Sequence, residues 1–208
     1  MNLTKPRVIT ISASSTLVRA AQVSRGGNVE KLARRSVDNG AIDVALRQAL
    51  AGFDVKNSSV LWVLPGDVAT TKNIEVPSTD NSEIESILAL QAARYTPFTK
   101  DEILLSYIKL GTPKPNFTRV LLIVVKRDAV KEKMVLLRTA GISMDTVVFA
   151  PEGIARFYSQ ALNVKKNDAP VALVDVNMQN TNFIVQLGGA VLMSQFVMSS
   201  LSEVPSLP

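Results

Sequence analysis

Polar side chains gather at the ends of two apolar, strand-like runs of the sequence, where they could act on a ligand. Asp175 lies near the end of the run VALVDV, just before a turn rich in asparagine and glutamine. A carboxylate in that place usually caps the turn or faces a ligand at the exit of the strand. Near the N-terminus, the run 8–11 leads into a hydroxyl-rich turn at 12–16, and such hydroxyls commonly bond the local backbone. Both stretches are therefore candidate ligand-binding sites, and in each the alternative is that the polar side chains only stabilise the turn.

The strands around these turns indicate how the polar groups are positioned. Residues 171–176 and 181–187 read as two strands, and Gly188-Gly189 leads into a third strand that ends near 198. A Gly-Gly pair between two strand-like runs is typical of a hairpin. The N-terminal stretch repeats the order strand, turn, strand. The two similar units suggest a duplicated α/β architecture.

The composition removes several classes of chemistry. The 208 residues contain no cysteine and no histidine, which excludes disulfides, Cys/His zinc sites, cysteine nucleophiles and Ser–His–Asp triads. A hydrophobic content of 47% indicates a folded protein. The N-terminus lacks the apolar core of a signal peptide, and no apolar run approaches the roughly 20 residues of a membrane helix. We therefore expect a cytosolic chain that inserts into no membrane and reaches one only through a partner.

The charge does not favour nucleic-acid binding. The formal net charge is +5, from 23 basic and 18 acidic residues, and the densest basic group is Arg25, Lys31, Arg34 and Arg35. Nucleic-acid-binding proteins usually concentrate basic groups on one face and interleave them with aromatic residues. Aromatic residues make up only 5% of this sequence. A solvated basic surface is the better interpretation, and no nucleic-acid partner is expected.

The first part of the chain reads as an α/β layer with a mixed sheet. Strands are predicted at 29–37, 59–64 and 70–76, and an apolar stripe at helical spacing predicts a helix at 40–53. Together with the opening strands, this gives the order β-β-β-α-β-β. Trp62 lies within a buried strand and is expected in the core.

Residues 78–149 read as a separate unit. Ser82 and Glu85 have the spacing of a capping box and predict a helix start, and Pro97 predicts its end near 94–98. Strands follow at 103–110 and 120–125, joined by a polar link at 111–116. A helix from Arg127 and a strand at 142–149 complete the unit, and a helix at 151–162 follows it. The charged segment 165–168 links that last helix to the strand at 171.

Four segments together resemble the family of the actin-like type IV pilus assembly protein PilM, which is related in fold to the cytoplasmic part of the type II secretion L protein. They are VLPGDVATTKNIEVP at 63–77, RYTPF at 94–98, the helix-bearing stretch 121–142, and VALVDVNMQNTNFIVQLGG at 171–189. The resemblance implies an α/β, actin-like (RNase H-like) ATPase fold. It implies a subdomain 1A at 1–76 and 150–168, an inserted subdomain 1C at 77–149, and the beginning of a second actin-like domain with a tail at 169–208.

The resemblance also implies a partner and a nucleotide. Members of the family lie at the cytoplasmic face of the inner membrane and bind the N-terminal cytoplasmic tail of a bitopic membrane assembly protein near the inserted subdomain. The residues expected there are Arg94, Tyr95, Pro97 and Phe98, although residues such as Tyr95, Pro97 and Phe98 more often serve core packing and the helix end than a partner groove. Many members hold ATP and magnesium between their domains. The matching nucleotide residues are Ser12, Ser14, Ser15, Asp175 and Thr181.

Departures from the family pattern weaken the nucleotide site. Two turns cradle the phosphates in this fold, and glycine is needed there because only a backbone without side chains lets N–H groups approach phosphate closely. The first turn, at 10–14, lacks both the aspartate and the glycine of the family. In the second, Asn177 replaces the glycine and Asn182 replaces an aspartate. We therefore expect no catalytic residues, no metal site and no enzyme activity. ATP with magnesium is the one cofactor whose binding the sequence leaves as an alternative.

Two functions follow as alternatives. The leading hypothesis is a non-catalytic adaptor of a type IV pilus or type II secretion-like inner-membrane platform. The alternative is an Mg-ATP-dependent actin-like ATPase or switch. The sequence ends after three strands and a polar tail at 201–208, whereas the fold has a further helical half. Strands left without that cover would favour pairing with another chain or docking on the first domain, and a concentration-dependent homo-oligomer is expected from the first of these.

Overall fold

The computed structural model describes residues 5–162, 169–176 and 180–198. These residues form two compact units, each built from two separate parts of the chain. The first unit takes its residues from Met1–Leu64 and Asp128–Val148, and the second from Pro65–Arg127 and Phe149–Pro208. The subdomain boundaries expected from the sequence remain a prediction.

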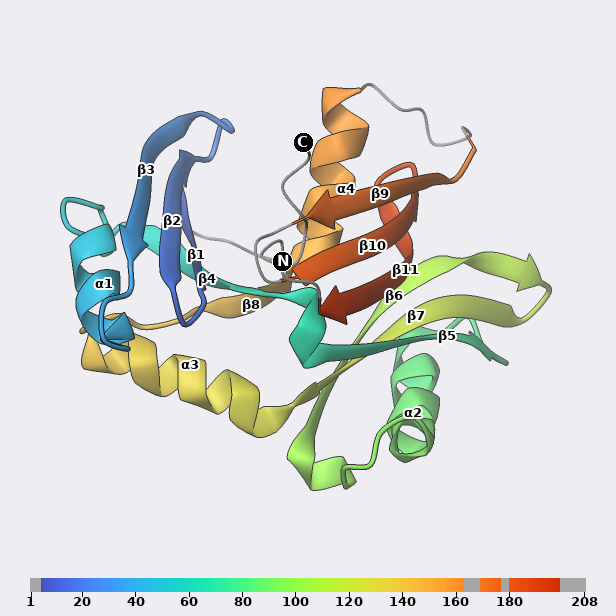
Figure 1. Cartoon of the computed structure of the whole chain (residues 1–208). Helices are drawn as coiled ribbons and strands as arrows, with labels where there is room; N and C mark the ends of the chain where they lie inside the picture. Colours follow the sequence, from blue (N-terminus) through green and yellow to red (C-terminus); the bar gives the residue numbers. More distant parts are fainter. Residues whose placement is uncertain (1–4, 163–168, 177–179, 199–208) are drawn as a thin grey trace, which may run out of the picture. The chain divides into compact units, whose positions relative to one another are not determined.

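A five-stranded sheet with the order β3-β2-β1-β4-β8 forms the first unit (Figure 1). The first three strands make an antiparallel meander, and β4 then pairs in parallel with β1. The parallel pairing requires a crossover, which the helix α1 (Ile42–Ala49) supplies. The strands are β1 (Arg7–Ala13), β2 (Leu17–Ser24), β3 (Val29–Ser36), β4 (Ser58–Leu64) and β8 (Thr146–Phe149).

The core of this unit lies on one face of the sheet. Side chains alternate between the faces of a strand, so Ile9 and Ile11 of β1 point the same way as Val60 and Trp62 of β4, and all four are at most 1% exposed. They pack against α1 and against Leu137 of α3 (Arg127–Thr139). The expectation that Trp62 is a core residue is confirmed.

The second unit contains a three-stranded antiparallel sheet with the order β5-β7-β6, covered on one face by α2 (Asn81–Gln91). Both faces of the central strand are buried, which explains its continuous apolar run VLLIVV. Three short 3-10 helices border this part: η1 (Gly66–Val68), η2 (Ala92–Arg94) and η3 (Lys100–Glu102). The strands are β5 (Ala69–Val76), β6 (Ile103–Lys114) and β7 (Phe117–Lys126).

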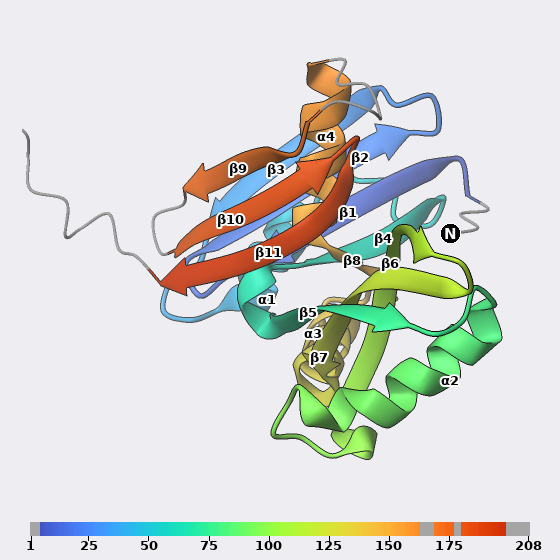
Figure 2. The ribbon, with the colours of Figure 1, turned by 90° about the vertical axis from the view of Figure 1, so that its right-hand side faces the viewer.

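A second three-stranded sheet of the same unit has the order β11-β10-β9 and packs against α4 (Ala150–Ala161), as both views show (Figures 1 and 2). Its strands are β9 (Val171–Val176), β10 (Asn180–Leu187) and β11 (Ala190–Met198). Gly188 and Gly189 have positive φ in the predicted hairpin turn. The side-chain oxygen of Thr71 on β5 donates to the carbonyl of Ser194 on β11, at 3.0 Å.

Several expectations about the elements were wrong in detail. The strand at 70–76 pairs with β7 rather than with the first layer, and the strand after Gly141 is shorter than expected and joins the first sheet beside β4. The polar link at 111–116 belongs largely to β6, which runs to Lys114. Asp80, not Ser82, caps α2, because its carboxylate accepts from the backbone N–H groups of Ser82 and Glu83.

Other expectations fall outside the described residues. They concern Asn177 and the rest of the turn at 177–179, the charged segment 165–168, and the tail at 201–208. In the part of the chain that the structure describes, no helix combines the length and the apolar character needed to cross a membrane.

Candidate partner and nucleotide sites

The hydroxyl-rich turn between β1 and β2 is closed by its own groups. The Ser14 hydroxyl oxygen accepts from the backbone N–H groups of Thr16 and Leu17, at 3.3 and 3.2 Å. The backbone N–H of Ser14 donates to the carbonyl of Leu17 at 2.9 Å. A phosphate cradle needs N–H groups that point at the ligand, and these three already have acceptors within the turn. The geometry does not fit a phosphate in this turn.

The other two serines of the predicted site have different surroundings. Ser15 is exposed at the tip of the turn. Ser12 lies on β1 and is half-buried on the sheet face opposite to α1, where it lines a shallow hollow with residues of β2 and β3. Ser12 and Ser14 therefore belong to different environments rather than to one ligand shell.

Asp175 bonds a neighbouring strand. It lies opposite Asn182 in the register of β9 and β10, and the Asn182 side-chain amide donates to the Asp175 carboxylate at 3.1 Å. Asn182 is 8% exposed, so this hydrogen bond lies in a largely buried place. Thr181 is also buried, one position along the strand and opposite Val176. Asn182 thus holds the carboxylate by a hydrogen bond across the two strands.

Gly66, which begins η1, makes room for this pair. A Cβ atom built on Gly66 would lie 2.8 Å from the Asn182 side-chain oxygen and 3.6 Å from Cγ of Pro151. In the sequence, Gly66 belongs to the tripeptide Pro-Gly-Asp that follows β4, and this tripeptide predicts a turn but no contact with Asn182. The close approach to a residue more than a hundred positions away has no local signal.

A second buried amide fixes the hairpin turn. Gln186 is fully buried, and its side-chain oxygen accepts from the Ser159 hydroxyl at 3.0 Å and from the backbone N–H of Gly189 at 2.8 Å. Among the residues that the structure describes, the side-chain nitrogen of Gln186 and the side-chain oxygen of Asn182 have no hydrogen-bond partner. Within the same residues, no three Asp, Glu, His or Cys side chains converge to hold a metal ion.

The candidate partner residues lie where α2 ends. Tyr95 and Phe98 are half-buried and pack against the core beneath α2, and the Lys126 ammonium lies 5.3 Å from the Phe98 ring centroid. Arg94 and Pro97 are exposed. Leu90, on the last turn of α2, is 77% exposed and four residues before Arg94. We call Leu90, Arg94 and Pro97 the α2 ridge. Leu90 was not among the partner residues predicted from the sequence. Its position could have indicated it, because it is an apolar residue outside the buried stripe of its helix.

The segment that follows the α2 ridge is held at both ends. The Glu102 carboxylate accepts from the backbone N–H and the hydroxyl of Thr99, each at 2.8 Å, and these hydrogen bonds hold the pKa of Glu102 below its ordinary value. The Arg127 guanidinium donates to the carbonyls of Asp101 and Ile103, at 2.9 and 3.1 Å. The ridge therefore sits on a fixed backbone.

A family comparison identifies the chain. The model of the family described as type IV pilus assembly protein PilM matches residues 14–195. The chain belongs to the PilM family. This match includes the α2 ridge and the strands β9 and β10.

Solved structures agree with the actin-like fold of this PilM-family chain. A chain of a PilM–PilN type IV pilus biogenesis complex has a TM-score of 0.81 at 19% identity, over 94% of this chain. The cytoplasmic domain of EpsL, an inner-membrane component of the type II secretion system of Vibrio cholerae, has a TM-score of 0.63 at 11% identity, over 92%. A Bacteroides thetaiotaomicron protein of unknown function with an actin-like ATPase fold has a TM-score of 0.55 at 12% identity, over 97%.

This PilM-family chain is shorter than these relatives. It spans 62% of the PilM–PilN chain, 71% of the EpsL domain and 73% of the Bacteroides protein. The actin-like fold class expected from the sequence is confirmed, and so is the family.

Proposed function

We propose that this chain is a non-catalytic cytoplasmic adaptor of a type IV pilus or type II secretion-like inner-membrane platform. In this proposal it reaches the membrane through a partner, by binding the short cytoplasmic tail of a bitopic membrane protein of the PilN type. The observation that supports it most strongly is the similarity over 94% of the chain to a chain of the PilM–PilN complex.

The α2 ridge is the proposed contact for that tail. Leu90 offers an apolar side chain, and Arg94 offers a guanidinium that pairs well with a carboxylate. Pro97 adds a rigid apolar surface. Because Glu102 and Arg127 fix the segment behind the ridge, little backbone order has to be gained on binding. A tail with an apolar residue close to an aspartate or glutamate fits this surface.

Calorimetric titration with a synthetic peptide tests the proposal. The peptide carries the N-terminal cytoplasmic residues of a PilN protein from the same organism. We expect binding, and we expect the substitutions Leu90→Ser and Arg94→Glu each to weaken it by roughly tenfold, which is the effect of losing one well-placed contact. Lys72→Glu is the matched control, since Lys72 is exposed on β5 of the same unit and carries the same charge as Arg94. Equal weakening by the control would show a non-specific charge effect and refute the ridge.

The local geometry supports an adaptor rather than an ATPase. Three backbone N–H groups of the first turn are bonded within the turn, and the Asn182 amide bonds Asp175. A nucleotide-dependent switch is the alternative, and it requires Mg-ATP to bind without glycine in the first turn. Titration with Mg-ATP separates the two functions, because the adaptor proposal expects no binding heat and the switch requires it.

Self-association is a further part of the proposed function. On the face of the β11-β10-β9 sheet away from α4, the side chains of Val174, Val176, Phe183, Met193 and Val197 are 39–55% exposed. Within the described residues β9 pairs only with β10, so its outer edge is open. The exposed side chains are uncharged, so a second copy of the chain meets no like-charge repulsion there. We propose that two copies pair through this face.

A further inference from the structure

We propose that the outer edge of β3 in the first unit accepts an extended acidic segment of another protein as an added strand. β3 is the last strand of its sheet, and within the described residues it pairs only with β2 (Figure 1). The edge of a sheet carries a row of unpaired backbone N–H and C=O groups. These groups point along the plane of the sheet, so a layer packed on either face leaves them open. The inference concerns a different surface from the α2 ridge and does not depend on it.

The alternation of hydrogen bonds shows which groups form this row. The backbone N–H of Val37 donates to the carbonyl of Thr16, directly opposite it across β2 and β3, at 2.9 Å. Along an antiparallel ladder, pairs that exchange hydrogen bonds alternate with pairs that do not. Leu32, Arg34 and Ser36 therefore direct their N–H and C=O groups away from β2.

Two other edge strands show the protection that β3 lacks. β8 has only four residues, and the ladder of β6 with β7 has two register shifts, both at Gly111. Short strands and bulges are ways in which proteins prevent an edge from pairing. β3 has eight residues, and its ladder with β2 is regular from Lys31 to Ser36. This stretch is therefore a suitable template for a further strand.

The side chains along this edge are basic. Lys31, Arg34 and Arg35 are exposed, and among the described residues none of them forms an ion pair with a carboxylate. Lys31 donates instead to the carbonyl of Gly52, and Arg35 donates to the carbonyl of Arg34 at 2.8 Å. Arg34 also lies opposite Arg19 of β2, and like charges opposite each other destabilise a sheet. The edge thus combines open backbone groups with positive charge that has no acidic partner.

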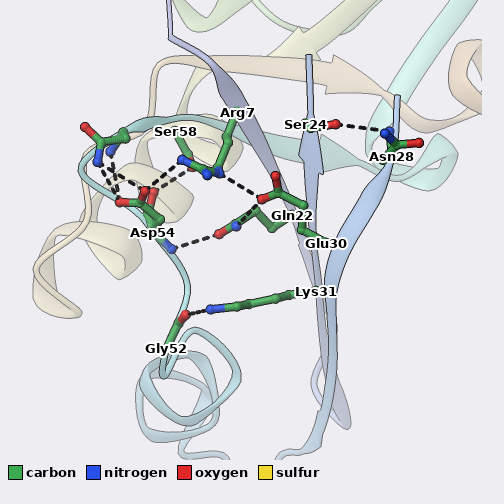
Figure 3. Close-up of polar contacts among 10 residues, drawn as sticks. Arg7, Gln22, Ser24, Asn28, Glu30, Lys31, Gly52, Asp54 and Ser58 are labelled. Atoms are coloured by element: carbon green, nitrogen blue, oxygen red, sulfur yellow. Dashed lines mark hydrogen bonds and ion pairs between the residues drawn. The ribbon is translucent and has the colours of Figure 1, made fainter. Parts of the chain in front are cut away.

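The acidic residue of β3 does not neutralise this charge. The Glu30 carboxylate accepts from the Arg7 guanidinium at 2.8 Å and from the Gln22 side-chain amide at 2.7 Å (Figure 3). It is therefore held beside β1 and β2 and is not directed to the basic side chains of its own strand.

The charge and the backbone together select the kind of partner. In strand addition, main-chain hydrogen bonds give affinity and side chains give specificity. Arg34 and Arg35 are neighbours on β3, so their side chains point to opposite faces of the sheet. Two adjacent carboxylates of an added strand can therefore lie beside them, one on each face. A second copy of the chain is disfavoured, since pairing two β3 edges brings arginines together on chains of net charge +5.

Fluorescence anisotropy with labelled peptides tests the proposal. The probe is an eight-residue peptide, the length of β3, made of threonine and valine with two adjacent glutamates at its centre. In the comparison peptide both glutamates are glutamine, and we expect the glutamate peptide to bind roughly tenfold more tightly.

Methylated peptides separate strand addition from simple charge attraction on the native chain. In two further glutamate peptides, alternate backbone nitrogens carry methyl groups, on the odd-numbered residues in one and on the even-numbered residues in the other. When both glutamates lie beside both arginines, only one of these two sets of N–H groups faces β3. We therefore expect one methylated peptide to lose binding and the other to keep it.

The variants Ser36→Pro and Ser36→Val make the same distinction on the protein. Proline removes the outward N–H and is tolerated on an edge strand when that N–H faces solvent, whereas valine keeps it. We expect Ser36→Pro to weaken binding roughly tenfold at a nearly native melting temperature, and Ser36→Val to bind like the native chain. Arg34→Gln and Arg35→Gln should each weaken binding. Arg138→Gln is their control and should not, because Arg138 is an exposed arginine on α3 of the same unit.

Several outcomes would overturn the proposal. No binding of the glutamate peptide at about 1 mM would show that the charges only protect the edge from pairing. Equal binding of the glutamine peptide, equal binding of the two methylated peptides, or equal loss with Arg138→Gln would show that no strand is added. A dimer that Ser36→Pro dissociates would assign the edge to a second copy of the chain.

Discussion

Asn182 holds Asp175 across the β9–β10 pair, with 3.1 Å between the amide nitrogen and the carboxylate oxygen. The same Asn182 side chain presents its oxygen to Gly66, where a Cβ atom would lie only 2.8 Å away. One buried amide therefore connects the turn after β4 with the strand that carries the candidate nucleotide residue. Two predictions follow from this arrangement.

The first prediction concerns Gly66. Replacing it with alanine places a methyl group against the Asn182 oxygen and close to Pro151, in a place without free space. We expect Gly66→Ala to lower the free energy of unfolding by about 1–3 kcal/mol, the usual cost of overpacking. Urea denaturation followed by circular dichroism measures this loss.

A double variant tells whether the clash with Asn182 is the cause. Asn182→Ala removes the oxygen that the new methyl group would meet, so Gly66→Ala should cost much less in the Asn182→Ala background. Strictly additive losses would show that the destabilisation comes from elsewhere in η1.

The second prediction concerns Asp175 and separates a structural role from a role in nucleotide binding. Asp175→Ala leaves the buried Asn182 amide without this acceptor, at a cost of about 1–3 kcal/mol in unfolding free energy. Asp175→Asn keeps an oxygen that can accept the bond and removes only the charge, so it should be nearly as stable as the native chain. Calorimetric titration of all three proteins with Mg-ATP should show no binding heat. Tight binding by the native chain that both variants lose would instead establish the nucleotide switch.

Local sequence patterns were sufficient to predict several of the strands and one of the turns. Period-two alternation and apolar runs located the strands β1, β4 and β7, and the Gly-Gly pair located the β10–β11 turn. Sheet membership was harder, because β5 follows β4 closely in sequence but pairs with β7, which comes later. The order of the strands along the chain does not show which strand β5 pairs with, because a short 3-10 turn redirects the chain after β4.

The candidate sites depended even more on distant residues. Asp80 and Ser82 both have the chemistry of a helix cap, and only the backbone geometry decides for Asp80. The contact of Gly66 with Asn182 and the cross-strand pair of Arg19 with Arg34 arise from pairing and register. A single sequence shows the residue types but not the register that brings them together.

The third prediction concerns stability in acid. A hydrogen bond from Gln22 and then the Arg7 guanidinium hold the pKa of Glu30 below its ordinary value. Hydrogen bonds from Asn57 and then Arg7 do the same for the pKa of Asp54 (Figure 3). Because both pKa values are lower in the folded state than in the unfolded state, the stabilisation is fully present above the unfolded values. It is lost as the pH falls through the folded ones. The melting temperature should therefore drop below about pH 4.5.

The variant Arg7→Met tests the origin of that drop. It removes the guanidinium that faces both carboxylates and keeps an apolar stem of similar length. We expect a lower melting temperature at pH 7 and a smaller further decrease between pH 5 and pH 3, measured by calorimetry. Arg47→Met is the comparison, since Arg47 pairs with Asp43 on the surface of α1, outside this network. An acid profile of Arg7→Met parallel to that of the native chain would contradict the assignment.

The fourth prediction concerns the open apolar face of the β11-β10-β9 sheet. Light scattering should show a dimer whose fraction rises with protein concentration. Phe183 lies opposite Val174 in the register, and both side chains are exposed at the middle of the sheet, at 42% and 55%. Phe183→Ser removes the largest of these side chains, so it should weaken dimerisation by roughly tenfold or more.

Phe157→Ser provides the matched control for this prediction. Phe157 is on α4 and is 72% exposed, so the substitution removes an equal apolar side chain from a different surface of the same unit. If dimerisation used any exposed phenylalanine, both variants would dissociate to the same extent. A monomer at every concentration tested, or equal dissociation by the two variants, would exclude pairing through this sheet. Loss with Phe183→Ser alone would place the second copy on the face of β9 and β10 and leave the α2 ridge free for a membrane partner.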